Sequence, residues 1–148
     1  MSATNAFETN LLLLVFNNTA IAAIGDGAGL QPSGADGSLY VSLHTADPGE
    51  VAAGGQAQSE CAYTSYARVA VARSVAGFTV AGNNVSNAAL VPFPTATGGV
   101  EIATYFGFGT DAAGAGNLLL SGVLTTPIAI STGIKPTADI GELDVTAD

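Results

Sequence analysis

Side chains that commonly carry out catalysis or bind metals are scarce in this sequence. It contains one histidine, His44, and one cysteine, Cys61, whereas acid–base and nucleophilic catalysis depends on such groups acting together. A zinc site would also need carboxylates to complete its coordination sphere. His44 lies where an expected strand meets a turn, which favours a structural or turn-capping role, and Cys61 has no CxxC partner. We therefore expect no catalytic residue, no metal site and no cofactor, and so no enzyme.

A glycine-rich run at residues 25–29 (GDGAG) is superficially similar to a phosphate-binding loop. It lacks the Lys-Ser/Thr pair of a P-loop, and it is not the GxGxxG motif that opens a helix after a strand. Asp26 and Asp36 lack the dense acidic spacing of a calcium loop. The C-terminal acids could collect a cation weakly, although charges that protect an edge strand are the commoner explanation; these acids are Asp139, Glu142, Asp144 and Asp148.

Basic residues are also rare. The chain contains three basic residues, Arg68, Arg73 and Lys135, and twelve acidic residues, so its formal net charge is −9. Counterion release on nucleic acid needs clustered Lys or Arg, so we expect no nucleic-acid partner. In so acidic a chain each arginine should be paired. Either guanidinium could contact a carboxylate of a neighbouring subunit, and a pair within the chain is an equal alternative.

The composition also limits what the surface can be. Hydrophobic residues make up 48% of the 148 residues and charged residues only 10%, against about 25% in ordinary soluble domains. The mean hydropathy is +0.43. A chain of this length suffices for one domain with a sizeable core. The surface is then covered either by small polar residues such as Ser, Thr and Asn or by partner proteins, and we favour partner proteins.

Nothing in the sequence indicates a membrane segment. The most apolar run, residues 11–16, is too short to cross a bilayer. No Lys or Arg precedes Arg68, so the basic region of a secretory signal is missing. We expect the chain to be made and folded in a cytoplasm, without a membrane partner.

The first segment, residues 1–20, predicts a helix. Asn5 is the expected N-cap, with Glu8 three residues later in capping-box register, and Asn17-Asn18 is the expected stop. Such a helix is apolar nearly all round and should be buried on more than one side. It could pack across its own β domain or insert between subunits, with contacts expected at Leu11, Leu14 and Phe16.

Turn signals then recur about every 8–12 residues, which is typical of a β-sandwich or jelly roll. Long loops are expected at 25–37, where the chain would be flexible or ordered by a partner, and at 49–62. Strands are expected at 39–44, 68–74, 78–80, 88–93, 100–110, 118–120, 126–131 and 140–145. The sequence thus predicts a mainly β, single domain over residues 1–148: an antiparallel β-sandwich or jelly-roll-like unit over 38–148, preceded by an N-terminal α-helix.

Several short stretches together resemble a family of small tailed-bacteriophage virion structural proteins. They follow the helical segment 10–16 in order and are 39–49 (LYVSLHTADPG), 66–68 (YAR), 91–94 (VPFP), 103–107 (ATYFG), 116–119 (GNLL) and 122–124 (GVL). The resemblance runs from residue 10 to about residue 145. The loop at 25–37 and the insertion at 49–62 are longer than in the usual pattern.

What the resemblance implies is a virion structural protein, made in the bacterial host cytoplasm, that binds other proteins. We favour a capsid decoration (cement) protein, a homo-oligomer on the outside of the shell that binds the major capsid protein or other virion proteins. Its contacts would include Leu11, Leu14, Phe16, Arg68 and Arg73. The alternative is a tail or tail-fibre component or adaptor. A carbohydrate-binding module is a third hypothesis, which the absence of Trp disfavours because sugars stack on exposed aromatics.

Overall fold

A computed structural model describes residues 3–50 and 55–147 of the chain. It confirms the predicted class, a mainly β, antiparallel fold with one N-terminal helix, consistent with a β-sandwich. The elements in chain order are α1 (Asn5–Asn17), β1 (Ser38–His44), the short 3-10 helix η1 (Gly55–Ala57), β2 (Val69–Ala72), β3 (Phe78–Ala81), β4 (Asn84–Asn87), β5 (Val91–Pro92), β6 (Glu101–Gly109), β7 (Leu118–Ile130), β8 (Thr137–Ala138) and β9 (Asp144–Thr146).

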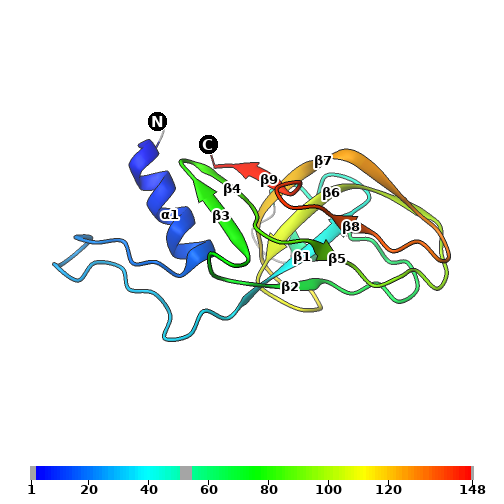
Figure 1. Ribbon diagram of the computed structural model, residues 1–148, viewed down its shortest axis with the longest axis horizontal. Coiled ribbons are helices and arrows are strands. Elements are labelled where there is room, and N and C mark those ends of the chain that lie inside the picture. The colour runs from blue at the N-terminus through cyan, green and yellow to red at the C-terminus, as the bar shows by residue number, and fades with distance from the viewer. Residues whose placement is uncertain (1–2, 51–54, 148) are drawn as a thin grey trace.

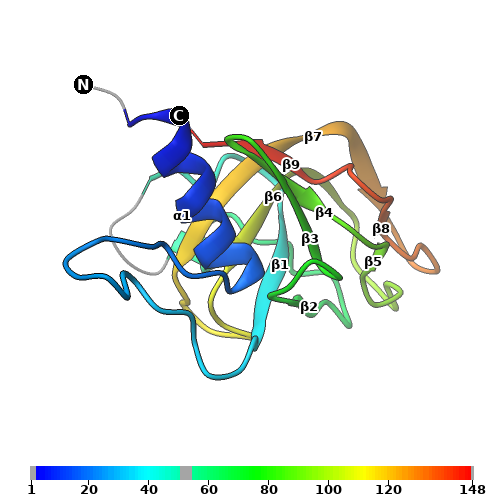
Figure 2. The ribbon, with the colours of Figure 1, turned by 60° about the vertical axis from the view of Figure 1, so that its left-hand side comes forward.

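Two main sheets face each other. The larger has the order β2-β1-β6-β7, the smaller has the order β3-β4-β9, and β5 pairs with β8 alone. All the pairings are antiparallel. Helix α1 packs beside β3 and β4, and Figure 2 shows it at one side of the sandwich, next to the smaller sheet. The sandwich therefore encloses one core, to which both sheets and the helix contribute.

Alternation along β1 and β6 directs one face of the larger sheet into this core. Leu43 lies opposite Phe106 in the register and Val41 lies opposite Phe108, and all four side chains are fully buried. Phe108 makes edge-to-face contacts with Phe16 of α1, at a ring-centroid distance of 5.5 Å, and with two other phenylalanines. Aromatic pairs in this geometry add stability beyond their burial. Phe108 thus joins the helix to the centre of the sheet.

The helix differs from the prediction at its start and in its burial. Thr4, and not Asn5, is the N-cap: its backbone is extended and its hydroxyl accepts a hydrogen bond of 3.3 Å from the Phe7 N–H. Glu8 is therefore out of capping-box register. The expected stop is confirmed, because Asn18 adopts the left-handed conformation with φ 52°. Only one side of α1 is buried within the chain, since Leu11 remains 42% exposed.

Most strands lie where the sequence predicts them, but three segments differ. The predicted strands at 118–120 and 126–131 form one edge strand, β7, which bulges at 124–127, where it includes Pro127, opposite the single residue Thr104. The predicted strand at 88–93 shrinks to β5, and β4 lies before it. The segment 140–145 contributes only the start of β9. Proline donates no ladder hydrogen bond, so Pro92 and Pro94 limit the pairing that β5 can form.

Residues 19–37, which we call the arm, project from one end of the molecule (Figure 1). The arm includes the predicted loop 25–37 and has a defined conformation of its own. Ile21 and Leu30 exchange two backbone hydrogen bonds of 2.9 and 2.8 Å. At the tip, the Asp26 carboxylate accepts hydrogen bonds from the N–H groups of Ala28 and Gly29. In the other predicted loop, 49–62, residues 51–54 lie outside the described residues and the remainder contains η1.

Candidate functional site

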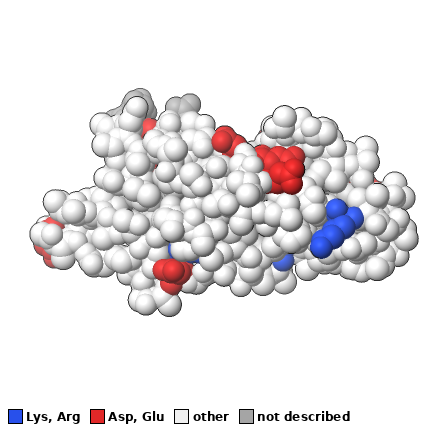
Figure 3. Space-filling view, in the orientation of Figure 1, with Lys and Arg blue, Asp and Glu red and all other residues white. Residues whose placement is uncertain are grey.

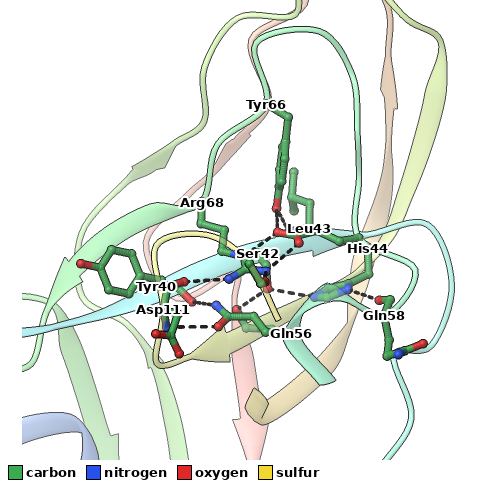
Figure 4. A network of polar contacts seen from close by, with 12 residues as sticks. Tyr40, Ser42, Leu43, His44, Gln56, Gln58, Tyr66, Arg68 and Asp111 are labelled. Atoms are coloured by element: carbon green, nitrogen blue, oxygen red, sulfur yellow. Dashed lines mark hydrogen bonds and ion pairs between the residues drawn. The ribbon is translucent and has the colours of Figure 1, made fainter. Parts of the chain in front are cut away.

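A buried polar network lies on the face of the larger sheet opposite the core (Figure 4). β1 places Tyr40, Ser42 and His44 on this face, and β6 places Gly107 opposite Ser42 and Gly109 opposite Tyr40. A Cβ atom at Gly109 would overlap the Gln56 amide. Gly109 therefore leaves the space in which Gln56 of the segment 55–62 lies against the sheet, whereas a Cβ atom at Gly107 would approach Leu118, His44 and Ser42.

Gln56 connects this covering segment to its neighbours. Its side chain is fully buried, which makes an unmet hydrogen bond expensive. Its Nε2 donates to the Tyr40 carbonyl at 3.1 Å, and its Oε1 accepts from the Asp111 N–H at 3.2 Å. One amide thus joins β1, η1 and the β6–β7 turn.

An ion pair between Arg68 and Glu60 completes the network. Arg68 Nε donates to Glu60 Oε1 at 2.7 Å and Nη2 donates to Oε2 at 2.8 Å. The same guanidinium donates to the carbonyl oxygens of Asp111 and Gly114 at 2.9 and 2.7 Å. The Tyr66 hydroxyl donates to Glu60 Oε1 at 2.8 Å. The hydrogen bonds to Glu60 hold the pKa of Arg68 above its usual value, so this group is a permanent cation that positions two loops.

His44 is part of the same layer and is fully buried. Its Nδ1 lies 2.7 Å from the Gln58 carbonyl oxygen, so Nδ1 carries a hydrogen, and its Nε2 lies 2.9 Å from Ser42 Oγ. Burial lowers the pKa of His44, and the opposing charges of Glu60 and Arg68 change it less. The ring is therefore neutral near pH 7 and serves the predicted structural role within β1.

Acid is expected to destabilise the protein through His44. The unfolded side chain binds a proton below a pH of about 6.5, whereas the folded one resists protonation because its pKa is lowered. The contribution of His44 is thus fully present above that pH and is lost as the pH falls. The free energy of unfolding should fall by up to about 1.4 kcal/mol per pH unit below pH ~6.5. Urea unfolding at a series of pH values checks this slope.

The control is the variant His44→Gln, which does not titrate in this range. It should be less stable overall, but its stability should change less between about pH 6.5 and 5, above the range in which most carboxylates titrate. Equal slopes in the two proteins would show that His44 does not account for the acid sensitivity.

Arg73 occupies a second position, at the base of the arm. Its Nη2 donates to the Leu14 carbonyl at 3.1 Å and to Asn18 Oδ1, and its Nη1 donates to Ser33 Oγ at 3.1 Å. Asn18 in turn donates to Asp36. Arg73 therefore links the end of α1 to the arm, beside an open cleft of about 380 Å³ that is lined by Leu14, Val15, Gln31, Ser33, Leu39, Arg73 and Leu119.

The residues predicted as interface contacts are distributed over different environments. Leu11 is exposed on α1, and Leu14 is half-buried beside Arg73 at the cleft. Phe16 is 1% exposed in the core, so its side chain is not available to a partner. Arg68 is buried and paired within its own chain, which is the alternative that the sequence left open. Of the five residues predicted as interface contacts, only Leu11, Leu14 and Arg73 are thus at least partly exposed to solvent.

Sequence reasoning missed the partners in the network. Glu60 and Gln56 lie in the segment predicted to be a small, polar loop, where nothing distinguishes a buried acid from a solvated one. Two signals were available. Glycines within the strongest predicted strand, at 107 and 109, indicate a close approach of another segment. Tyr66 and Arg68 stand together in a cation-poor chain, and such an arginine requires an acidic partner.

Neither metal-binding nor membrane-spanning features stand out. Across residues 3–50 and 55–147, no three or more His, Cys, Asp or Glu side chains gather in a way that could hold a metal ion. Within the same described parts, no helix has both the length and the apolar character needed to cross a bilayer.

A comparison with protein-family models identifies the family to which the chain belongs. A family model described as podophage GP4 fiber I protein gp80 matches residues 2–146. The chain belongs to this family. Membership in the fibre I family confirms the predicted resemblance to phage virion structural proteins, so the chain is a bacteriophage virion component. No curated protein matches the chain. The family description refers to a fibre and so agrees with the predicted tail-fibre alternative at least as well as with capsid decoration.

Proposed function

We propose that this protein is a structural subunit of a podophage fibre that acts by binding other virion proteins, without catalysis. The observation that carries the proposal is the match to the fibre I family over residues 2–146, nearly the whole chain. A match of this extent includes the helix, both sheets and the arm. The proposal therefore applies to the domain as a whole.

The fold supports a binding role over a chemical one. The polar groups that could take part in chemistry are used internally: His44 bonds Ser42 and the Gln58 carbonyl, and Arg68 holds Glu60. Neither Arg68 nor Arg73 is free to bind phosphate, because each donates several hydrogen bonds inside the chain. Protein surfaces are thus the partners that this exterior fits best, rather than nucleic acid.

Capsid decoration is the second candidate, and one observation favours it. In the described residues every strand folds back into a single sandwich, and none extends into a repetitive shaft. A subunit of this shape could clamp neighbouring capsid proteins as well as connect parts of a fibre. The two functions differ in the neighbour, in the number of copies and in the position on the particle.

Location on the particle tests the proposal. Purified virions are dissociated into heads and tails, and the amount of this chain in each fraction is measured by quantitative mass spectrometry relative to the major capsid protein. We expect a few copies per particle, all with the tail and fibre fraction, and antibody labelling at the fibres in electron micrographs. Hundreds of copies that remain on isolated heads would contradict the fibre proposal and support decoration.

A further inference from the structure

The arm and a group of turns lie at opposite ends of the long axis of the molecule (Figure 1). At one end the arm tip presents Ile24, Asp26 and Leu30. At the other end, the turns that join β5 to β6 and β7 to β8 present Val100, Ile134 and Lys135, and we call this end the turn pole. The two ends differ in charge and share exposed apolar side chains.

The arm has a defined conformation, yet few of its side chains are buried. Within residues 19–37 every residue except Ile21, Gly29 and Pro32 is exposed, and Ile24 and Leu30 are 38% and 44% exposed. Ala23 has a positive φ of 61°, which is strained for a residue with a Cβ. Fixing so many residues in one conformation costs conformational entropy that burial normally offsets. A surface that is prepared in this way but left uncovered is typical of a contact with another protein.

The backbone of the turn pole is also held in a defined conformation by hydrogen bonds. The Ala96 N–H donates to the Ile134 carbonyl and the Gly133 N–H donates to the Ala96 carbonyl, both at 2.8 Å. On this hydrogen-bonded backbone, the side chain of Val100 is 86% exposed and that of Ile134 is 41% exposed. The nearby Glu101 carboxylate is engaged, because it accepts hydrogen bonds from the N–H groups of Ala62 and Tyr63.

The exposed charges at the two ends have opposite signs. All three basic residues of the chain lie within its described parts, and of these only Lys135 is exposed, since Arg68 is buried and Arg73 is half-buried at the base of the arm. Figure 3 shows basic atoms towards one end of the long axis and acidic atoms at the far tip of the arm, with further acidic atoms along the middle of the molecule. The acidic tip of one copy and the exposed cation of another are therefore complementary.

We propose that a second copy of this chain binds head to tail, with the arm tip of one copy against the turn pole of the next. Ile24 and Leu30 pack on Val100 and Ile134, and Asp26 pairs with Lys135. The contact uses different surfaces on the two copies, so it repeats and produces either a ring or an open row of subunits. It deepens the fibre proposal by naming a neighbour, and its test needs only the purified chain.

The test is sedimentation velocity of the purified chain over a range of concentrations. The unaltered chain should associate reversibly. Asp26→Asn removes the charge and retains an oxygen that can accept from the Ala28 and Gly29 N–H groups, so the arm tip keeps its shape. Asp26→Asn and Lys135→Gln should each weaken association about fivefold, as expected for one exposed ion pair. Ile134→Ser should weaken it further by removing apolar contact.

Matched controls make the result specific. Asp36→Asn removes the same charge from the base of the arm, and Val75→Ser removes an exposed apolar side chain from the β2–β3 turn; neither should change association. Once Asp26→Asn is present, Lys135→Gln should have no additional effect. Circular dichroism confirms that each variant is folded. Three results would each overturn the inference: a chain that stays monomeric up to its solubility limit, pole variants that behave like the controls, or additive effects at residues 26 and 135. A monomeric chain found at fibres would refute only the head-to-tail contact.

Discussion

Replacing Arg68 with methionine is expected to lower the free energy of unfolding by about 3–5 kcal/mol, because it leaves the Glu60 carboxylate without a cation. The side chains of Arg68 and Glu60 are 3% and 16% exposed, so water cannot easily take the place of the guanidinium. The carbonyl oxygens of Asp111 and Gly114 lose their donors at the same time. Urea or thermal unfolding, followed by circular dichroism, measures the loss.

The control replaces both members of the pair. Arg68→Met combined with Glu60→Gln should be more stable than Arg68→Met alone, because a neutral amide is less costly to bury than a carboxylate. The Tyr66 hydroxyl retains an acceptor in the double variant, since the glutamine oxygen can take the place of Glu60 Oε1. If the single variant lost less than about 1 kcal/mol, the pair would behave like a surface ion pair and would not position the loops.

Replacing Phe108 with alanine should have an effect of similar size. The side chain is fully buried and contacts the rings of Phe16, Phe78 and Phe106. Truncation of a phenylalanine in such a core costs about 3–5 kcal/mol, through lost burial and the cavity that remains. Because Phe16 lies on α1, the helix should loosen first, which hydrogen exchange at the Leu12 and Phe16 amides would detect.

Phe7→Ala provides the comparison for Phe108→Ala. Phe7 lies on the same helix but is 45% exposed, so its removal should change the free energy of unfolding by about 0.5 kcal/mol or less. If Phe108→Ala lost no more stability than Phe7→Ala, Phe108 would not anchor the helix to the core as its contact with Phe16 indicates.

The strands that sequence reasoning predicted best are those with strong local signals. The stretch 39–44 alternates and ends at a Pro-Gly turn, and 100–110 is rich in β-branched and aromatic residues; both are strands in the structure. The residues Gly82-Asn83-Asn84 indicate a hairpin turn, and in the structure Gly82 and Asn83 join β3 to β4, which begins at Asn84. In each case the residues themselves favour the observed backbone, so tertiary contacts did not have to override them.

The features that were missed depend on distant contacts. β7 runs through Pro127 because the bulge opposite Thr104 relieves that residue of a ladder hydrogen bond, and no local pattern announces such a bulge. Phe16 was expected at an interface because its helix is apolar nearly all round, but only the fold determines which side meets the core. Glu60 and Arg68 pair across eight positions of irregular chain, and spacing alone does not reveal that contact.

Pro127 on the edge strand β7 has a consequence for how subunits of this protein can meet. An unpaired edge strand can pair with strands of other molecules and so extend the sheet without limit, as in cross-β fibrils. Proline offers no amide hydrogen to an incoming strand, and the bulge around it breaks the flat register that such stacking requires. The β7 edge of the larger sheet is thus protected against the addition of strands from neighbouring subunits, which must meet through other surfaces.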